Sequence, residues 1–122
     1  MDSPVKGFSH AQLRVSDVDA SVAWYSAAVG LAAAGPPQSG AVAMFGAGGR
    51  FAIVISGERP EPAGGELDHI AFGVGDRDAL ASWGDHLASI GIEHSGLVES
   101  GEGVSIHLHD PDGLEVELLA PK

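Results

Sequence analysis

Two segments of the chain alternate between apolar and polar side chains, a pattern typical of a strand that lays one face on a core. The first runs from Phe8 to Val15, and the second begins at His69. Every second residue is apolar on the face predicted to be buried: Ala11, Leu13 and Val15 in the first segment, and Ile70, Phe72 and Val74 in the second. His10 and His69 fall on the opposite faces. We therefore predict two similar strands, each with a histidine pointing away from the core.

An aspartate and a helical pattern follow each predicted strand. The side chains of Asp17 and Asp76 can accept hydrogen bonds from first-turn N–H groups, and Gly30 and Gly91 are suitable helix ends. Apolar stripes at helical spacing contain Val18, Val22, Tyr25 and Val29, with Trp24 beside them, in the first helix, and Leu80, Trp83, Leu87 and Ile90 in the second. We expect these stripes, both tryptophans included, to pack on the apolar strand faces.

Shorter strand-like runs, interrupted by glycine, come after each predicted helix. They cover residues 41–45, 50–56, 104–109 and 114–119. Each half of the chain therefore has the pattern of a βαβββ module in which the third strand is the weakest. The polar residues 58–66, rich in Gly and Pro, are expected to be a linker.

The two halves are also related in sequence. An offset of 59 residues superimposes the segment at His10 on the segment at His69 without a gap. The identical pairs at this offset are His10 and His69, Val15 and Val74, Asp17 and Asp76, Asp19 and Asp78, Ala20 and Ala79, and Trp24 and Trp83. We interpret the match as a duplication, and two copies are too few for a solenoid.

The predicted fold is α+β, with one domain over residues 1–122. Module one covers about residues 7–57 and module two about residues 67–120. We expect the two modules to form a curved mixed sheet around a cup, with the helices on its outer face. His10 and His69 would then point into the same cup.

Composition and charge narrow the function. The chain has 122 residues, of which 44% are hydrophobic and 19% charged, and this size suits one globular domain. It has 17 acidic residues and 6 basic ones, so its formal net charge is −11. Such a surface repels a nucleic-acid backbone and an anionic membrane, and we expect neither as a partner.

Cysteine is absent from the sequence. Its absence excludes disulfides, thiolate metal ligands and thiol nucleophiles, so any metal site must use histidine and carboxylate. No apolar run approaches the roughly 20 residues of a membrane span, and the first residues lack the apolar stretch of a signal peptide. We therefore expect a cytoplasmic protein.

Three segments carry a resemblance to a known family. They are residues 10–31, with HAQLRVSD followed by SVAWYSAAVGL, residues 68–72 (DHIAF), and residues 110–118 (DPDGLEVEL), the most specific of the three. The chain resembles the vicinal oxygen chelate superfamily over about residues 7–120. That superfamily contains glyoxalase I, extradiol dioxygenases, methylmalonyl-CoA epimerase, fosfomycin-resistance transferases and bleomycin-resistance binding proteins.

The resemblance implies a metal site. In the metal-binding members, the ligands are the first-strand histidine, the corresponding histidine of the second module, and the carboxylate seven residues after the first Asp of the DPDG motif. Those positions are His10, His69 and Glu117 here, and the implied cofactor is a divalent cation such as Fe, Mn, Co, Ni or Zn. Two imidazoles and one carboxylate leave coordination positions open for water and substrate. Taken alone, each histidine is more often a residue that merely finds a hydrogen bond.

Comparing Glu117 with Glu115 and with its match in module one limits the predicted set of metal ligands. Glu115 has the same strand parity as Glu117, but it lies closer to the turn and is expected to be a solvated charge. The residue that matches Glu117 in module one, aligned through Gly49 and Gly113, is Ile53. Four-ligand members such as glyoxalase I have a carboxylate there, so a three-ligand site is expected in this chain.

Further polar residues are candidates for contact with a substrate. His107 is a candidate general acid or base, and Glu117 is the second catalytic candidate. The plainer interpretation of His107 is an ordinary polar strand residue. Gln12 and Arg14 share the face of His10 and are candidates for substrate binding, Gln12 the better of the two. The remaining histidines, His86, His94 and His109, are expected to be exposed.

The leading functional prediction is a small glyoxalase-like metal enzyme. Its cation would hold vicinal or carbonyl oxygens of a small-molecule substrate and stabilise the enolate formed by proton transfer, as in a lyase or isomerase. The alternative is a metal-free binding protein, similar to bleomycin-resistance proteins, that sequesters a hydrophobic or cationic compound, and the net charge suits a basic ligand. A dioxygenase is a weaker alternative, because the only tyrosine, Tyr25, falls in a helix stripe.

A homodimer is expected for two reasons. Two modules of this kind expose sheet edges, and members of the superfamily often complete the cup by pairing modules between chains. In that arrangement His10 of one subunit would meet His69 and Glu117 of the other.

Overall fold

The structure of the protein is a computed structural model that describes residues 2–4, 8–35, 40–49, 52–59 and 67–122. The chain divides into two compact units, residues 1–61 and 62–122. The first two residues of the run predicted at 50–56, and most of the predicted linker, lie outside the described residues.

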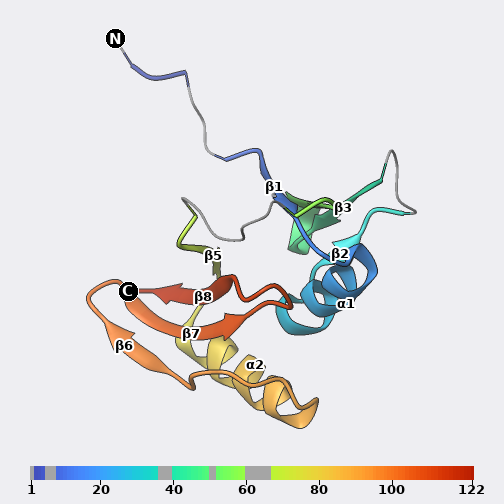
Figure 1. The fold of residues 1–122 in the computed structure, drawn as a ribbon. Coiled ribbons are helices and arrows are strands. Elements are labelled where there is room, and N and C mark those ends of the chain that lie inside the picture. Colours follow the sequence, from blue (N-terminus) through green and yellow to red (C-terminus); the bar gives the residue numbers. More distant parts are fainter. Residues whose placement is uncertain (1, 5–7, 36–39, 50–51, 60–66) are drawn as a thin grey trace. The chain divides into compact units, whose positions relative to one another are not determined.

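The first unit contains one helix and a four-stranded sheet (Figure 1). Its elements are β1 (His10–Arg14), α1 (Val18–Val29), β2 (Ala32–Ala33), β3 (Ala41–Phe45) and β4 (Ala52–Ser56), with a short 3-10 turn, η1 (Ala47–Gly49), before β4. The strand order is β1-β4-β3-β2. The pair β1 and β4 is parallel, and the other pairs are antiparallel.

The second unit repeats this topology. Its elements are β5 (His69–Gly73), α2 (Arg77–Ser89), β6 (Val98–Ser100), β7 (Gly103–His109) and β8 (Glu115–Pro121). The strand order is β5-β8-β7-β6, again with only the pair β5 and β8 parallel among the described strands of this unit. The prediction of two βαβββ modules with mixed sheets is therefore confirmed.

The predicted helix boundaries are confirmed by the caps. The Asp17 side chain accepts a hydrogen bond from the Ala20 N–H at 3.0 Å, and Asp76 accepts one from Ala79 at 2.8 Å. Gly30 follows α1 with φ of 78°, a left-handed conformation that glycine adopts without strain. Both helices are shorter than 18 residues, and none in the described part of the chain is long and apolar enough to cross a membrane.

The weakest strand is the second of each module rather than the third. β2 has 2 residues and β6 has 3, and each lies at the edge of its sheet. An alternation this short cannot be distinguished from a loop in the sequence. The predicted boundaries of the longer strands agree with the observed boundaries to within two residues, and those of β3 agree at both ends.

The core of each unit lies between its helix and one face of its sheet. In the first unit, Leu13, Val15, Tyr25 and Ile55 are buried. In the second, the buried residues include Phe72, Leu80, Leu87, Ile106, Leu108, Val116 and Leu118. The apolar faces predicted for the first strand of each module are therefore the buried ones, and the helix stripes supply the other side of each core.

The structure corrects the prediction that both tryptophans pack in the core. Trp24 and Trp83 are only half-buried, and Ile90 is 45% exposed. In α2 the buried stripe runs through Gly84, where an added Cβ would stand 3.1 Å from Cδ1 of Ile106. The helix approaches the sheet too closely there for a large side chain, so the indole of Trp83 lies at the edge of the core, its ring centroid 4.7 Å from that of His86.

Candidate functional site

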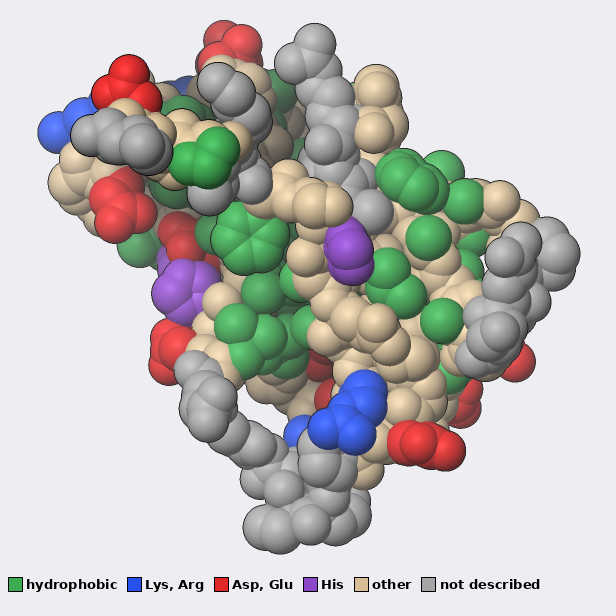
Figure 2. Space-filling model, turned by 90° about the horizontal axis from the view of Figure 1, so that it is seen from above, with side chains coloured by type: hydrophobic (Ala, Val, Ile, Leu, Met, Phe, Trp, Pro, Cys, Tyr) green, Lys and Arg blue, Asp and Glu red, His purple; other side chains and the backbone are tan. Residues whose placement is uncertain are grey.

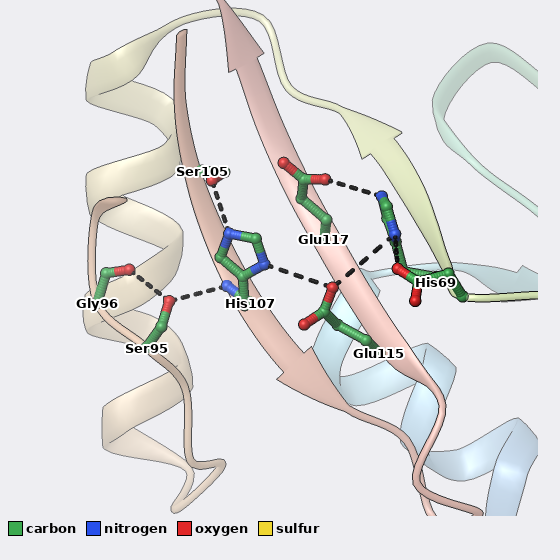
Figure 3. Close-up of polar contacts among 8 residues, drawn as sticks. His69, Ser95, Gly96, Ser105, His107, Glu115 and Glu117 are labelled. Carbon is green, nitrogen blue, oxygen red and sulfur yellow. Dashed lines mark hydrogen bonds and ion pairs between the residues drawn. The ribbon is translucent and has the colours of Figure 1, made fainter. Parts of the chain in front are cut away.

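The site candidates of the second unit share one face of its sheet. The register places His69 beside Glu115 on β8, and His107 on β7 opposite Glu117. Alternate residues of a strand point to the same face, so these four side chains lie on the face opposite to Ile106, which packs near α2. Figure 3 shows the four side chains pointing toward one another from three strands.

The DPDG motif sets where β8 begins. Oδ1 of Asp110 accepts hydrogen bonds from the N–H groups of Asp112 and Leu114, both at 2.9 Å. Gly113 has φ of 88°, a conformation that favours glycine. This turn joins β7 to β8 and fixes the register that puts Glu115 and Glu117 on the polar face.

His69 contacts carboxylates through both ring nitrogens. Its Nε2 lies 3.4 Å from Oε1 of Glu117, while its Nδ1 lies 2.8 Å from Oδ2 of Asp68 and 4.0 Å from Oε2 of Glu115. The hydrogen bond to Asp68 raises the pKa of His69 above its ordinary value of 6.5, and the charges of Asp68, Glu117 and Glu115 add to the rise while desolvation opposes it. Asp68 therefore holds the ring with Nε2 toward Glu117.

The structure corrects the prediction that Glu115 is a solvated charge. Its side chain is only 36% exposed, and its Oε2 lies between two imidazoles, 4.0 Å from Nδ1 of His69 and 3.8 Å from Nδ1 of His107. Asp68, His69 and Glu115 each offer one atom that could bind a metal ion, and these three atoms lie within 4.8 Å of one another. Figure 2 shows acidic and histidine side chains side by side at the surface.

His107 makes contacts at both ring nitrogens and at its backbone. Nε2 lies 2.9 Å from Oγ of the buried Ser105, and Nδ1 faces Glu115. The backbone N–H of His107 donates to Oγ of Ser95 at 2.9 Å, and Ser95 N–H donates to the carbonyl of His107 at 3.0 Å. These contacts fix the position of the imidazole on the polar face (Figure 3).

The first unit holds His10 and the predicted substrate contacts. His10, Gln12 and Arg14 are exposed on one face of β1, as their parity predicted. Nδ1 of His10 lies 3.0 Å from Oγ of Ser9, and Nε2 of Gln12 donates to Oγ of Ser56 at 3.0 Å. Ser9 corresponds to Asp68 at the repeat offset. In both modules, therefore, the residue before the histidine engages Nδ1.

The match of Glu117 in module one is Val54, not Ile53. His10 on β1 pairs with Ala52 on β4, as His69 on β5 pairs with Glu115 on β8. Ala52 therefore corresponds to Glu115, and Val54, two residues further along β4, corresponds to Glu117. Ile53 is buried on the other face. The alignment through glycines failed because the connection before β4 is one residue longer than the one before β8. Val54 also lacks a carboxylate, so this correction does not change the expected number of ligands, and the three-ligand site stays a prediction.

The remaining histidines divide into two groups. His86 and His109 are exposed, as predicted. His94 is a correction, because it is half-buried with Nε2 3.1 Å from the carbonyl of Gly84, and its Nδ1 accepts from the Gly96 N–H at 3.0 Å. It ties the loop after α2 to the helix.

The structure thus brings together His69, Glu117 and His107, three of the predicted site residues. Sequence reasoning missed the roles of Asp68 and Ser105. Asp68 could have been found from its place before a repeated histidine, whereas nothing in the pattern distinguishes Ser105 from other strand serines. The predicted meeting of His10 with His69 and Glu117 joins two units and stays a prediction, as do the substrate contacts of Gln12 and Arg14.

The donor set in the second unit fits a divalent cation. Metal bonds to histidine nitrogen and carboxylate oxygen are about 2.0–2.2 Å long, so two ligand atoms of one tetrahedral ion lie roughly 3.3 Å apart. Nε2 of His69 and Oε1 of Glu117 are 3.4 Å apart. A metal-ligating histidine almost always donates its other N–H to a carboxylate or carbonyl, which is the arrangement of His69 and Asp68.

The sequence matches the Glyoxalase/Bleomycin resistance protein/Dioxygenase superfamily over residues 7–118. The chain therefore belongs to that superfamily, which is the vicinal oxygen chelate superfamily indicated by its motifs. No curated protein matches the sequence significantly.

Solved structures share the fold at low sequence identity. Lactoylglutathione lyase from Agrobacterium tumefaciens is 20% identical with a TM-score of 0.76, covering 95% of this chain and 94% of its own. A glyoxylase/bleomycin resistance protein/dioxygenase domain from Frankia sp. EAN1pec is 22% identical with a TM-score of 0.79, covering 97% and 99%. The fosfomycin resistance protein FosX from Listeria monocytogenes is 23% identical with a TM-score of 0.76, covering 97% and 95%.

Proposed function

We propose that this protein is a metal-dependent enzyme of the lyase or isomerase type, acting by proton transfer on a small molecule with vicinal or carbonyl oxygens. The observation that carries the proposal is the pair His69 and Glu117, whose ligand atoms are 3.4 Å apart while Asp68 engages the far nitrogen of His69. His10 completes the ligand set in this proposal. Its Nδ1 contact with Ser9 supports that role, because it leaves Nε2 for a metal.

Each predicted residue has a defined task. His10, His69 and Glu117 would hold the cation, which when bound supplies a positive charge that stabilises an enolate or oxyanion. Glu117 and His107 are the catalytic candidates because they face each other across β7 and β8. Gln12 and Arg14 would contact the substrate through their exposed N–H groups on β1. We place the protein in the cytoplasm as one domain per chain, and as a homodimer.

Metal retention tests the proposed site. We expect Glu117→Gln to lower the affinity for Mn²⁺, Co²⁺ or Zn²⁺ by at least 10-fold, because it removes a charged ligand. Glu115→Gln is the matched control: it lies two residues away on the same face and should retain the metal. Metal analysis of untagged protein purified without chelator, followed by titration, measures both variants. Equal retention by the two variants would show that Glu117 is not a ligand.

Solvent deuterium exchange tests the chemistry. Metal-loaded protein should promote exchange of the carbon-bound protons of hydroxyacetone, a simple α-hydroxy ketone, and removal of the metal should abolish it. The metal-free binding function is favoured by the net charge of −11. It would replace the enzyme proposal if no α-hydroxy carbonyl compound exchanged while the metal-free protein bound a cationic aromatic drug at micromolar affinity.

A further inference from the structure

The hydrogen bonds around His107 determine which of its nitrogens carries the proton. Ser105 is 2% exposed, and its Oγ lies 2.9 Å from Nε2 of His107. Among the described residues, this nitrogen is the one hydrogen-bond partner found for the Ser105 hydroxyl. If Nε2 carried the proton, the hydroxyl would accept and its own O–H would be left buried without an acceptor, which is costly. The hydroxyl therefore donates to an unprotonated Nε2.

Glu115 leads to the same assignment from the other side of the ring. Its Oε2 stands 3.8 Å from Nδ1 of His107. An ionised carboxylate repels a nitrogen lone pair and attracts an N–H, so it favours the proton on Nδ1. At 3.8 Å the contact is too long for a hydrogen bond, and the Nδ1–H stays available to another acceptor.

The position of this N–H points to a role. The His107 side chain is 29% exposed, so a small molecule can reach it, and it lies opposite Glu117 in the register of β7 and β8. A neutral imidazole that presents N–H to the site cannot remove a proton through that nitrogen. It can donate a hydrogen bond to an oxygen that gains negative charge during the reaction.

We propose that Ser105 and Glu115 hold His107 as the Nδ1–H tautomer, so that His107 donates a hydrogen bond to a carbonyl oxygen of the substrate instead of acting as the base. The role toward substrate rests on the proposed function, whereas the tautomer does not. Proton removal would then fall to a carboxylate of the same face, Glu117. Ser105 is the positioning residue in this arrangement.

Nitrogen NMR tests the tautomer without metal or substrate. Two-bond ¹H–¹⁵N correlations identify the protonated ring nitrogen, and we would record them at about pH 8.5, two units above the ordinary histidine pKa. We expect Nδ1–H for His107 in the wild type and in Ser105→Thr, which keeps the hydroxyl, and a mixture of tautomers in Ser105→Ala. A wild type protonated at Nε2 would overturn the proposal, and so would a Ser105→Ala variant with the wild-type tautomer.

Two variants of His107 separate a donor from a base. His107→Asn places an amide N–H on Cγ, the same covalent distance from the backbone as Nδ1, but it cannot take a proton. We expect His107→Asn to keep the hydroxyacetone exchange rate within about 10-fold, and His107→Ala to lower it roughly 100-fold or more, the usual cost of losing such a donor. If both variants were equally slow, the donor role would be wrong. A wild type without exchange contradicts the proposed function and with it the donor role, while the tautomer measurement still decides what Ser105 and Glu115 do.

Discussion

Asp68 and Ser9 occupy the same position in the two modules but differ in charge. Both engage Nδ1 of the histidine that follows, Asp68 at 2.8 Å and Ser9 at 3.0 Å. A carboxylate strengthens the hydrogen bond and favours the protonated ring, whereas a hydroxyl only orients it. The two predicted histidine ligands are therefore held in similar orientations by groups of unequal strength.

Removing the charge of Asp68 should lower the pKa of His69. We expect Asp68→Asn to lower that pKa toward 6.5, because the hydrogen bond to Asp68 is its largest cause. Glu115→Gln is the control and should lower it less, since its charge is the weakest contribution. NMR titration of the metal-free protein measures both, and an equal or larger effect of Glu115→Gln would contradict the assignment.

The raised pKa of His69 also makes the stability of the protein depend on pH. Because folding favours the protonated ring, the contribution of His69 to stability is fully present below pH 6.5 and is lost as pH rises through its raised folded pKa. A metal at Nε2 competes with that proton, so binding should weaken as pH falls through the same value.

At the scale of elements, β7 contributes alternate residues to the core and to the candidate site. Val104, Ile106 and Leu108 are buried on one face, while Ser105 and His107 face the site. The strand begins at Gly103, which has φ of 144° and pairs with Pro121 at the end of β8. A side chain cannot be accommodated there, because an added Cβ would stand 2.2 Å from the carbonyl oxygen of Ala120.

Gly103→Ala should therefore destabilise the second unit. We expect the free energy of unfolding to fall by roughly 2–4 kcal/mol, from backbone strain and the clash with β8. Gly101→Ala is the matched control: it lies two residues away, has open space around its Cβ, and should change stability by less than about 0.5 kcal/mol. Urea unfolding measures both variants, and similar midpoints would show that the β7 end tolerates a side chain.

Elements with strong local signals were predictable from the sequence. Asp17 and Asp76 cap their helices, and the turn after Asp110 is encoded within four residues. The failures depend on contacts between distant residues. Trp83 leaves the core because α2 approaches Ile106 at Gly84, and the role of Glu115 depends on a neighbour contributed by another strand. No spacing within the chain contains that information.

At the scale of the whole molecule, the modules could be predicted because the repeat marks both halves, and the family because residues 10–31, 68–72 and 110–118 carry its motifs. The partner of each module could not, because the same repeat is compatible with pairing within a chain or between chains. Edge strands such as β6, with Val98 38% exposed, leave backbone groups open to pairing. The way in which the modules pair therefore also decides whether the predicted ligands of one metal site come from one chain or from two.

Dimers that combine two different variant chains distinguish the two kinds of pairing. We expect a homodimer by sedimentation at micromolar concentration. If its modules pair between chains, His10→Ala and Glu117→Gln chains, each defective alone, should regain one intact metal site of two in every mixed dimer, because the unaltered His10 meets an unaltered Glu117. Metal titration after unfolding and refolding the two chains together measures this. Recovery of no site would show that modules do not pair between chains, and a monomer would contradict the dimer itself.

The register of the sheets also bears on how the two halves diverged. Glu117 and His107 correspond to Val54 and Ala43, so the polar face of one copy matches an apolar pair in the other. If the modules arose by duplication, as their repeat indicates, only one copy has ionisable groups at these two positions, while the other carries His10, Gln12 and Arg14 on its polar face. The two positions therefore place different demands on their residues in the two copies. Substitutions at Val54 and Ala43 should be limited by size, and those at Glu117 and His107 by charge.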